Sequence, residues 1–95
     1  AFRHVILKQN YPNPCSTVAT IPFKLMNPSQ VTIDVYDMMG KKMHSLLDQQ
    51  MDAGDHEVVF NNTNGLLAKG NYVYQVVVVN ELGRYHQCKV LTIQD

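Results

Sequence analysis

Turn-forming residues divide this chain into apolar runs that are too short for an amphipathic helix of three turns. Gly, Pro, Asn and Asp interrupt the sequence at intervals of about ten residues, which is typical of strands joined by tight turns. Between the interruptions β-branched residues dominate, since 12 Val, 4 Ile and 5 Thr make up 21 of the 95 residues. Such side chains are stiff about their first torsion and pack well on a pleated surface. The sequence therefore predicts an all-β chain, with the strand spacing of a sandwich or barrel.

Seven strands are expected between about residues 4 and 93, in one domain that covers residues 1–95. Their predicted ranges are His4–Lys8, Thr17–Leu25, Val31–Tyr36, Lys41–Leu47, His56–Phe60, Tyr72–Val79 and Arg84–Ile93. The longer connections are the kinked segment Asn10–Pro14 and two loops, Asp48–Asp55 and Asn61–Gly70. Pro22 cannot donate a ladder hydrogen bond, so its strand is placed at a sheet edge or beside a bulge.

Alternation along the strands predicts which residues face the core. The expected core includes Ile21, Phe23, Val31, Ile33, Val35, Val58, Phe60, Tyr74 and Val76. The strand Tyr72–Val79 is apolar on both faces, so it is either central and covered on both sides or exposes one face to a partner. The last strand, Arg84–Ile93, alternates poorly and is expected at a sheet edge.

Charge and hydropathy exclude several classes of function. Eight Lys and Arg offset eight Asp and Glu, so the formal net charge is zero. Nucleic-acid binding and docking on an anionic membrane both need a surplus of basic residues. The longest apolar run, Val76–Val79, is far shorter than the ~20 residues that span a bilayer. We therefore expect no nucleic-acid partner and no membrane insertion.

No catalytic, metal or cofactor site emerges from the residue spacing, so the chain is not expected to be an enzyme. The Asp55–Glu57 run includes a histidine between two acids, but it falls at a loop-to-strand corner and is interpreted as solvated. Asn61–Thr63 matches a glycosylation acceptor, yet it more plausibly supplies turn hydrogen bonds ahead of Asn64 and Gly65. Four histidines fall on four different predicted strands, without a pair at ligand spacing: His4, His44, His56 and His86.

The chain contains two cysteines, Cys15 and Cys88, which are 73 positions apart. They could form a disulfide in an oxidising compartment, or remain two free thiols. The first and last strands of an Ig-like sandwich often lie side by side, so contact between the two is geometrically feasible.

Seven sequence blocks follow one another in a single order between Gln9 and Ile93. They are Gln9–Pro14, Thr20–Leu25, Val31–Asp37, Met38–Lys42, Ala53–His56, Leu67–Tyr74 and Lys89–Ile93. Each block is weak on its own. Together they resemble the C-terminal sorting domain of type IX secretion system cargo, in its type A form (the Por secretion system family), from Bacteroidetes-type bacteria.

This resemblance implies a seven-stranded, Ig-like antiparallel β-sandwich that acts as an address for an N-terminal passenger protein. Such proteins enter the periplasm by a signal peptide, and the type IX translocon then carries them to the cell surface or medium. A surface sortase removes the domain, at a junction expected near or before Ala1. The implied partners are the translocon, the sortase and the passenger, and no cofactor is implied.

The residues shared with the family are interpreted as supports of the fold: Tyr11, Pro12, Pro14, Tyr36, Gly40, Gly54, Gly70 and Tyr72. The glycines stand where hairpins reverse, and the hydroxyls of Tyr36 and Tyr72 are able to reach backbone carbonyls. The position after Pro14 is usually aromatic in the family. Here it is Cys15, which either weakens the local packing or replaces it with a disulfide.

The candidate recognition residues are those of the closing motif: Lys89, Val90, Leu91, Thr92 and Ile93. A terminal edge strand offers unpaired backbone groups that a partner can use for β-augmentation. The alternative is that this strand is a sheet edge without a partner. A rival reading is an accessory Ig- or fibronectin-like module that is adhesive or binds carbohydrate. The absence of Trp lowers this alternative, because sugar-binding sandwiches usually expose aromatic platforms.

Overall fold

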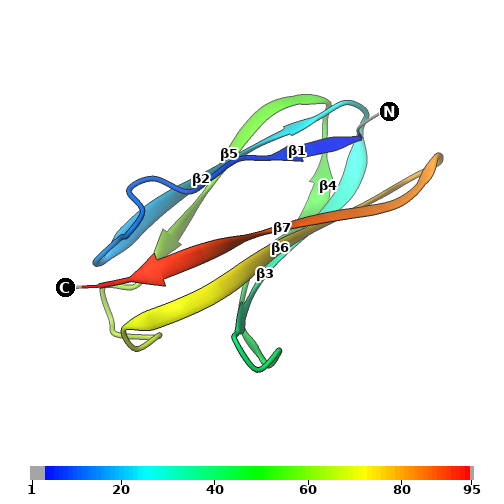
Figure 1. Cartoon of the computed structure of the whole chain (residues 1–95). Helices are drawn as coiled ribbons and strands as arrows, with labels where there is room; N and C mark the ends of the chain where they lie inside the picture. The colour runs from blue at the N-terminus through cyan, green and yellow to red at the C-terminus, as the bar shows by residue number, and fades with distance from the viewer. Residues whose placement is uncertain (1–3, 95) are drawn as a thin grey trace.

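The computed structural model describes residues 4–94, which form seven strands and no helix. The strands lie in two antiparallel sheets, one in the order β1-β2-β5 and the other in the order β4-β3-β6-β7. The two sheets pack against each other as the layers of a sandwich (Figure 1). The predicted all-β chain of seven strands is thus confirmed. The strand bounds are β1 Val5–Leu7, β2 Val18–Leu25, β3 Ser29–Asp37, β4 Lys42–Met51, β5 Gly54–Asn61, β6 Gly70–Asn80 and β7 Gly83–Ile93.

The core lies between the inner faces of the two sheets, and strand alternation identified most of it. Eight of the nine predicted core residues are fully buried, while Val58 is only half-buried and packs against the edge of the core. Further buried residues come from the ends of the strands and from the loops: Val5, Leu7, Cys15, Ala19, Leu25, Leu67, Tyr72, Val78, Leu91 and Ile93.

β2 is not an edge strand, which corrects one of the two predictions made from Pro22. It lies between β1 and β5, and Pro22 pairs with Glu57 of β5. On the other side, Lys8 N donates to Pro22 O at 3.0 Å. The next pair joins Tyr11 and Thr20, so the N-terminal segment advances three residues while β2 advances two. The extra residue is the bulge that the other prediction placed beside Pro22.

β4 is longer than predicted, and most of the expected polar loop Asp48–Asp55 is strand. Only Asp52 and Ala53 connect β4 to β5. β4 is the edge strand of its sheet, so its polar side chains face water and show little alternation. Two register shifts in its pairing with β3 disturb the alternation further. The Asp55–Glu57 run consequently lies within β5 rather than at a loop-to-strand corner.

β6 is a central strand, hydrogen-bonded to β3 and to β7. Its inner face is buried, but its outer face is open to solvent: Val73 and Val77 are half-buried and Val79 is 44% exposed. The prediction that β6 is a central strand is therefore confirmed, whereas the prediction that both of its faces are covered is wrong. β7 lies at the sheet edge, as predicted.

The tight turns are stabilised by hydrogen bonds to the same Asp and Asn residues whose presence predicts turns. Asp37 Oδ1 accepts hydrogen bonds from Met39 N and Lys41 N, both at 2.9 Å. Gly40 in the same turn has a φ of +87°, a conformation that costs glycine little. In the loop after β5, Asn61 Oδ1 accepts from Thr63 N at 2.9 Å, which confirms the predicted turn role of this segment.

Candidate recognition surface

The closing motif alternates between the two faces of β7, so only part of it is accessible. Leu91 and Ile93 are buried in the core, and Lys89 lies on the same inward face, half-buried. Val90 and Thr92 face outward, and Val90 is 47% exposed. Val90 is therefore the most accessible of the five side chains to a partner.

The free backbone edge of the closing motif is already occupied by the segment that follows β1. Gln9 Nε2 donates to Val90 O at 2.9 Å. Thr92 N donates to Asn13 Oδ1 at 3.3 Å. These groups lie on the side of β7 that faces away from β6. The backbone groups expected to be available for β-augmentation at Lys89–Ile93 are thus largely bound within the chain.

Cys15 completes this cap. Its backbone forms a parallel bridge with Ile93, in which Cys15 N donates to Thr92 O at 3.0 Å and Gln94 N donates to Cys15 O at 2.8 Å. The Cys15 side chain is buried against the core, and burial raises the pKa of its thiol. Cys15 therefore serves as a packing residue at the end of β7.

The disulfide between Cys15 and Cys88 is not formed, and both thiols are free. Cys15 lies beside Ile93, five residues further along β7 than Cys88. At about 3.3 Å per residue this offset is roughly 16 Å, whereas the Cα atoms of a disulfide lie within about 7 Å. Cys88 is also exposed on the outer face, while Cys15 is buried.

The first half of β7 keeps its edge open. The backbone N–H and C=O groups of alternate residues in a strand point to the same side. The groups of Arg84, His86 and Cys88 therefore point away from β6, like those of Val90 and Thr92. Among residues 4–94, no hydrogen bond reaches the outward groups of these three residues. The edge of β7 is therefore divided into an open half and a capped half.

The side chain of Gln87 joins the edges of the two sheets. Leu7 N donates to Gln87 Oε1 at 2.8 Å, and Gln87 Nε2 donates to Val5 O at 2.9 Å. The amide of Gln87 thus takes the place of a neighbouring peptide group beside β1. The His4 ring stacks on Tyr85 of β7 with centroids 3.9 Å apart. Through these contacts β1 is held against the inner face of β7.

Tyr74 positions the capping segment from inside the core. Its hydroxyl donates to Lys8 O at 2.9 Å and accepts from Asn10 N at 2.9 Å. Burial raises the pKa of Tyr74 to about 12. Asn10 is itself buried, and its Nδ2 donates to Pro12 O at 2.8 Å. These bonds hold the path of the chain as it leaves β1 towards the end of β7.

Tyr11 and the two prolines lie in this capping segment. The Tyr11 hydroxyl donates to Glu57 Oε2 at 2.6 Å, and this hydrogen bond raises the pKa of Tyr11. The peptide bonds that precede Pro12 and Pro14 are both cis.

The other motif residues support the turns, with one exception. The Tyr72 hydroxyl donates to Ala68 O at 2.6 Å, as predicted. Tyr36 instead lies half-exposed on the outer face of the four-stranded sheet, where it lines a groove of about 400 Å³ together with Val73, Gln75 and Cys88. Gly54 and Gly70 have φ values of +126° and +149°.

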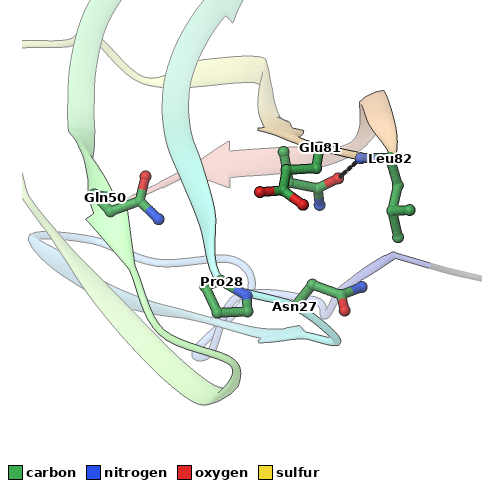
Figure 2. A pocket seen from close by; sticks show the side chains of 6 residues that line it. Asn27, Pro28, Gln50, Glu81 and Leu82 are labelled. Atoms are coloured by element: carbon green, nitrogen blue, oxygen red, sulfur yellow. Dashed lines mark hydrogen bonds between the residues drawn. The ribbon is translucent and has the colours of Figure 1, made fainter.

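A second hollow, of about 490 Å³, lies at one end of the sandwich (Figure 2). It is lined by Asn27, Pro28, Gln50, Asn80, Glu81 and Leu82. Asn80 Oδ1 accepts from Leu82 N at 2.8 Å, so this amide is used to shape the β6–β7 hairpin. Glu81 is the single titratable residue of the hollow, which leaves it without a pair of groups for acid–base chemistry.

The histidines lie apart from one another. His56 packs beside Phe23 with centroids 5.4 Å apart, and His44 meets the edge of Phe60 at 6.4 Å. His86 is exposed on β7. Within the described residues 4–94, no group of three His, Cys, Asp or Glu side chains could hold a metal ion. The same part of the chain contains no helix that is long and apolar enough to cross a membrane.

Residues 9–87 match the family described as the secretion system C-terminal sorting domain, and the chain belongs to this family. The chain is thus a sorting signal of type IX secretion, which is carried by a secreted or cell-surface cargo protein. The predicted resemblance is confirmed. The match ends before Lys89, so the closing motif lies outside the matched residues. No curated protein matches the sequence.

Two solved structures share the fold. Dimeric latent PorU from Porphyromonas gingivalis aligns with a TM-score of 0.68 and 22% identity, over 95% of this chain and 9% of that chain. CopC from Methylosinus trichosporium OB3b aligns with a TM-score of 0.58 and 17% identity, over 96% of this chain and 94% of that chain. The chain therefore spans a small part of the PorU structure and nearly the whole of CopC.

Proposed function

We propose that this domain is the sorting signal of a passenger protein. The type IX translocon recognises the domain in the periplasm and delivers the passenger to the cell surface. A surface sortase then removes the domain. The observation that carries this proposal is the family match over residues 9–87. The expected cleavage junction near or before Ala1 lies outside the described residues.

We assign the sandwich to the Ig-like class on its strand order. One sheet contains β1, β2 and β5, and the other contains β3, β6 and β7. This division corresponds to strands A, B and E against C, F and G of an Ig-like domain. β4 lies beside β3 rather than beside β5, so it extends the larger sheet.

We propose that the translocon reads β7, including the closing motif Lys89–Ile93. In this motif the backbone groups of the free edge are bound by Gln9, Asn13 and Cys15. The groups that remain for recognition by the translocon are the side chains on the outer face of the sheet. Val90 is the most accessible of them. Lys89 lies on the inward face, which makes it a poor position for testing recognition separately from packing.

An adhesive or carbohydrate-binding module is disfavoured by the surface. Among the tyrosines and phenylalanines of residues 4–94, Tyr11 is the one that is more than half exposed, and its hydroxyl is bound to Glu57. A single tethered ring is a small platform for a sugar, because such sites usually present several aromatic faces.

The proposal is tested by fusing the domain to an inert periplasmic reporter in a host with a type IX system. We expect the fusion to reach the cell surface or medium, while the reporter without the domain stays in the periplasm. A fusion that stays in the periplasm like the bare reporter would reject the sorting function.

The role of the closing motif is tested separately with Val90→Arg, matched by Val18→Arg on the outer face of β2 in the other sheet. Both valines are similarly exposed, at 47% and 40%, so both variants should remain folded. We expect reduced export for the Val90 variant and normal export for the Val18 variant. Normal export of both would reject recognition through Val90 while leaving the sorting function intact.

A further inference from the structure

We propose that the open half of the β7 edge, Arg84–Cys88, accepts an extended strand from a protein of the type IX machinery, which then joins the four-stranded sheet as a fifth strand. This inference rests on the proposed function and adds the mode of binding. The docking site lies just before the closing motif, where backbone hydrogen-bonding groups remain unpaired.

The edge is a regular template for another strand. β6 and β7 pair without a register shift from Asn80 and Gly83 to Gly70 and Ile93. The N–H and C=O groups of Arg84, His86 and Cys88 therefore point away from β6 at the ordinary strand spacing. Rows of unpaired backbone groups of this kind bind an additional strand unless the protein protects them.

Each of the other sheet edges carries a feature that discourages strand addition. β4 has two register shifts against its neighbour β3. β1 spans three residues, and its free edge is bound by the amide of Gln87. β5 places the like charges of Asp55 and Glu57 at successive positions on its outward side. Such irregularities, short lengths and charges are the means by which proteins discourage strand addition.

The capping segment sets the length of the site. Gln9, Asn13 and Cys15 bind the edge from Val90 to Gln94, so a docked strand must end near Val90. Three outward residues remain for pairing. So short a ladder buries much less than the roughly 1,000 Å² expected of a stable interface between two copies of one chain. The geometry therefore favours a partner that also makes contacts beyond the strand.

Apolar side chains beside the open edge supply such contacts. Val77 pairs with His86 and Val79 pairs with Arg84, both on the outer face of the sheet. Cys88 borders the groove that Tyr36 and Val73 also line. A docked strand with apolar residues at its outward positions would extend this surface across the edge of the sheet.

His86→Pro is the sharpest test, because it removes the outward N–H of β7 and leaves the pairing with β6 intact. Proline is tolerated on an edge strand when its nitrogen faces solvent. The matched control is Val59→Pro, which removes an outward N–H from the edge of β5. Circular dichroism and thermal unfolding of both purified domains establish that each variant is folded.

Each variant is then fused to the periplasmic reporter. We expect His86→Pro to lower export by about tenfold or more, since strand addition loses a central hydrogen bond and gains a steric clash. Val59→Pro should export like the unmodified domain. A folded His86→Pro variant that exports normally would overturn the inference. The unmodified fusion is measured alongside. If the sorting function itself failed, the unmodified fusion would also stay in the periplasm.

Cys88 provides a second measurement that does not depend on a proline. Its free thiol is exposed on the strand that would be covered, whereas Cys15 is buried. In cells with an active translocon, we expect a maleimide to modify Cys88 of the periplasmic fusion several-fold more slowly than in cells without the translocon. Equal rates would overturn the inference. So would a stable dimer of the isolated domain that His86→Pro dissociates, because a second copy would then occupy the edge.

Discussion

The hydroxyl of Tyr74 donates a 2.9 Å hydrogen bond to the carbonyl oxygen of Lys8. Lys8 faces Pro22 of β2, and Lys8 N donates to Pro22 O. In a regular antiparallel pair the residue in the place of Pro22 would return a hydrogen bond to Lys8 O. Proline has no N–H, so a side chain from the opposite sheet supplies the missing donor. This bond explains how a proline is accommodated in the central strand of a sheet.

Tyr74→Phe should destabilise the domain by about 1–3 kcal/mol, because it leaves Lys8 O and Asn10 N without their buried partner. The loss should be smaller in a Pro22→Ala background, where residue 22 can donate to Lys8 O. Urea unfolding of the two single variants and the double variant measures this coupling. Additive effects would show that Tyr74 does not substitute for the donor that Pro22 lacks.

Stability should fall between about pH 10 and pH 12 through ionisation of Tyr74. Its pKa is raised to about 12 in the folded protein, above the value of 10.0 expected when unfolded. In this interval the folded state binds more protons than the unfolded state, so raising the pH favours unfolding. The part of the loss due to Tyr74 is on the order of 2 kcal/mol and should be missing from the Tyr74→Phe variant, in which the contributions of the raised pKa values of Tyr11 and Cys15 remain. Thermal unfolding of both proteins across this range provides the measurement.

Gln87→Leu should release β1 from the inner face of β7. The substitution removes the hydrogen bonds to Leu7 N and Val5 O and keeps a side chain of similar size. We expect a loss of about 1–3 kcal/mol and faster hydrogen exchange at the Leu7 amide. Gln49→Leu on the exposed part of β4 is the matched control and should change neither quantity. Unchanged exchange at Leu7 in the Gln87 variant would contradict the proposed bridge.

Thiol titration should find two free cysteines in the denatured, unreduced protein. In the folded protein Cys88 should react quickly and Cys15 slowly, because Cys15 is buried and burial raises the pKa of its thiol. Mass spectrometry after brief alkylation identifies the modified residue. Recovery of fewer than two thiols after denaturation would indicate a disulfide and contradict the structure.

Local patterns in the sequence predicted the parts of the fold that local forces control. Alternation in β2 and β3 identified the buried faces because successive side chains of a strand point to opposite sides. Asp37 and Gly40 predicted a hairpin because their own hydrogen bonds and φ angle form it. The order of the motif blocks likewise identified the family, which the match over residues 9–87 confirms.

The sheet neighbours could not be read from such patterns, since they depend on residues far apart in the chain. Pro22 indicated an edge strand because nothing near it in sequence shows that Tyr74 replaces its missing donor. The polar end of β4 was interpreted as a loop because an edge strand exposed to water carries no apolar alternation.

The division of the β7 edge is the clearest case of a feature decided by tertiary structure. The sequence by itself determined an all-β sorting domain and the inner faces of its main strands. Which half of the last strand remains open depends on where Gln9, Asn13 and Cys15 meet it, about 80 residues along the chain. Those contacts join the side-chain amides of Gln9 and Asn13 and the backbone of Cys15 to backbone groups of β7, and no pattern local to either segment shows that the two segments meet.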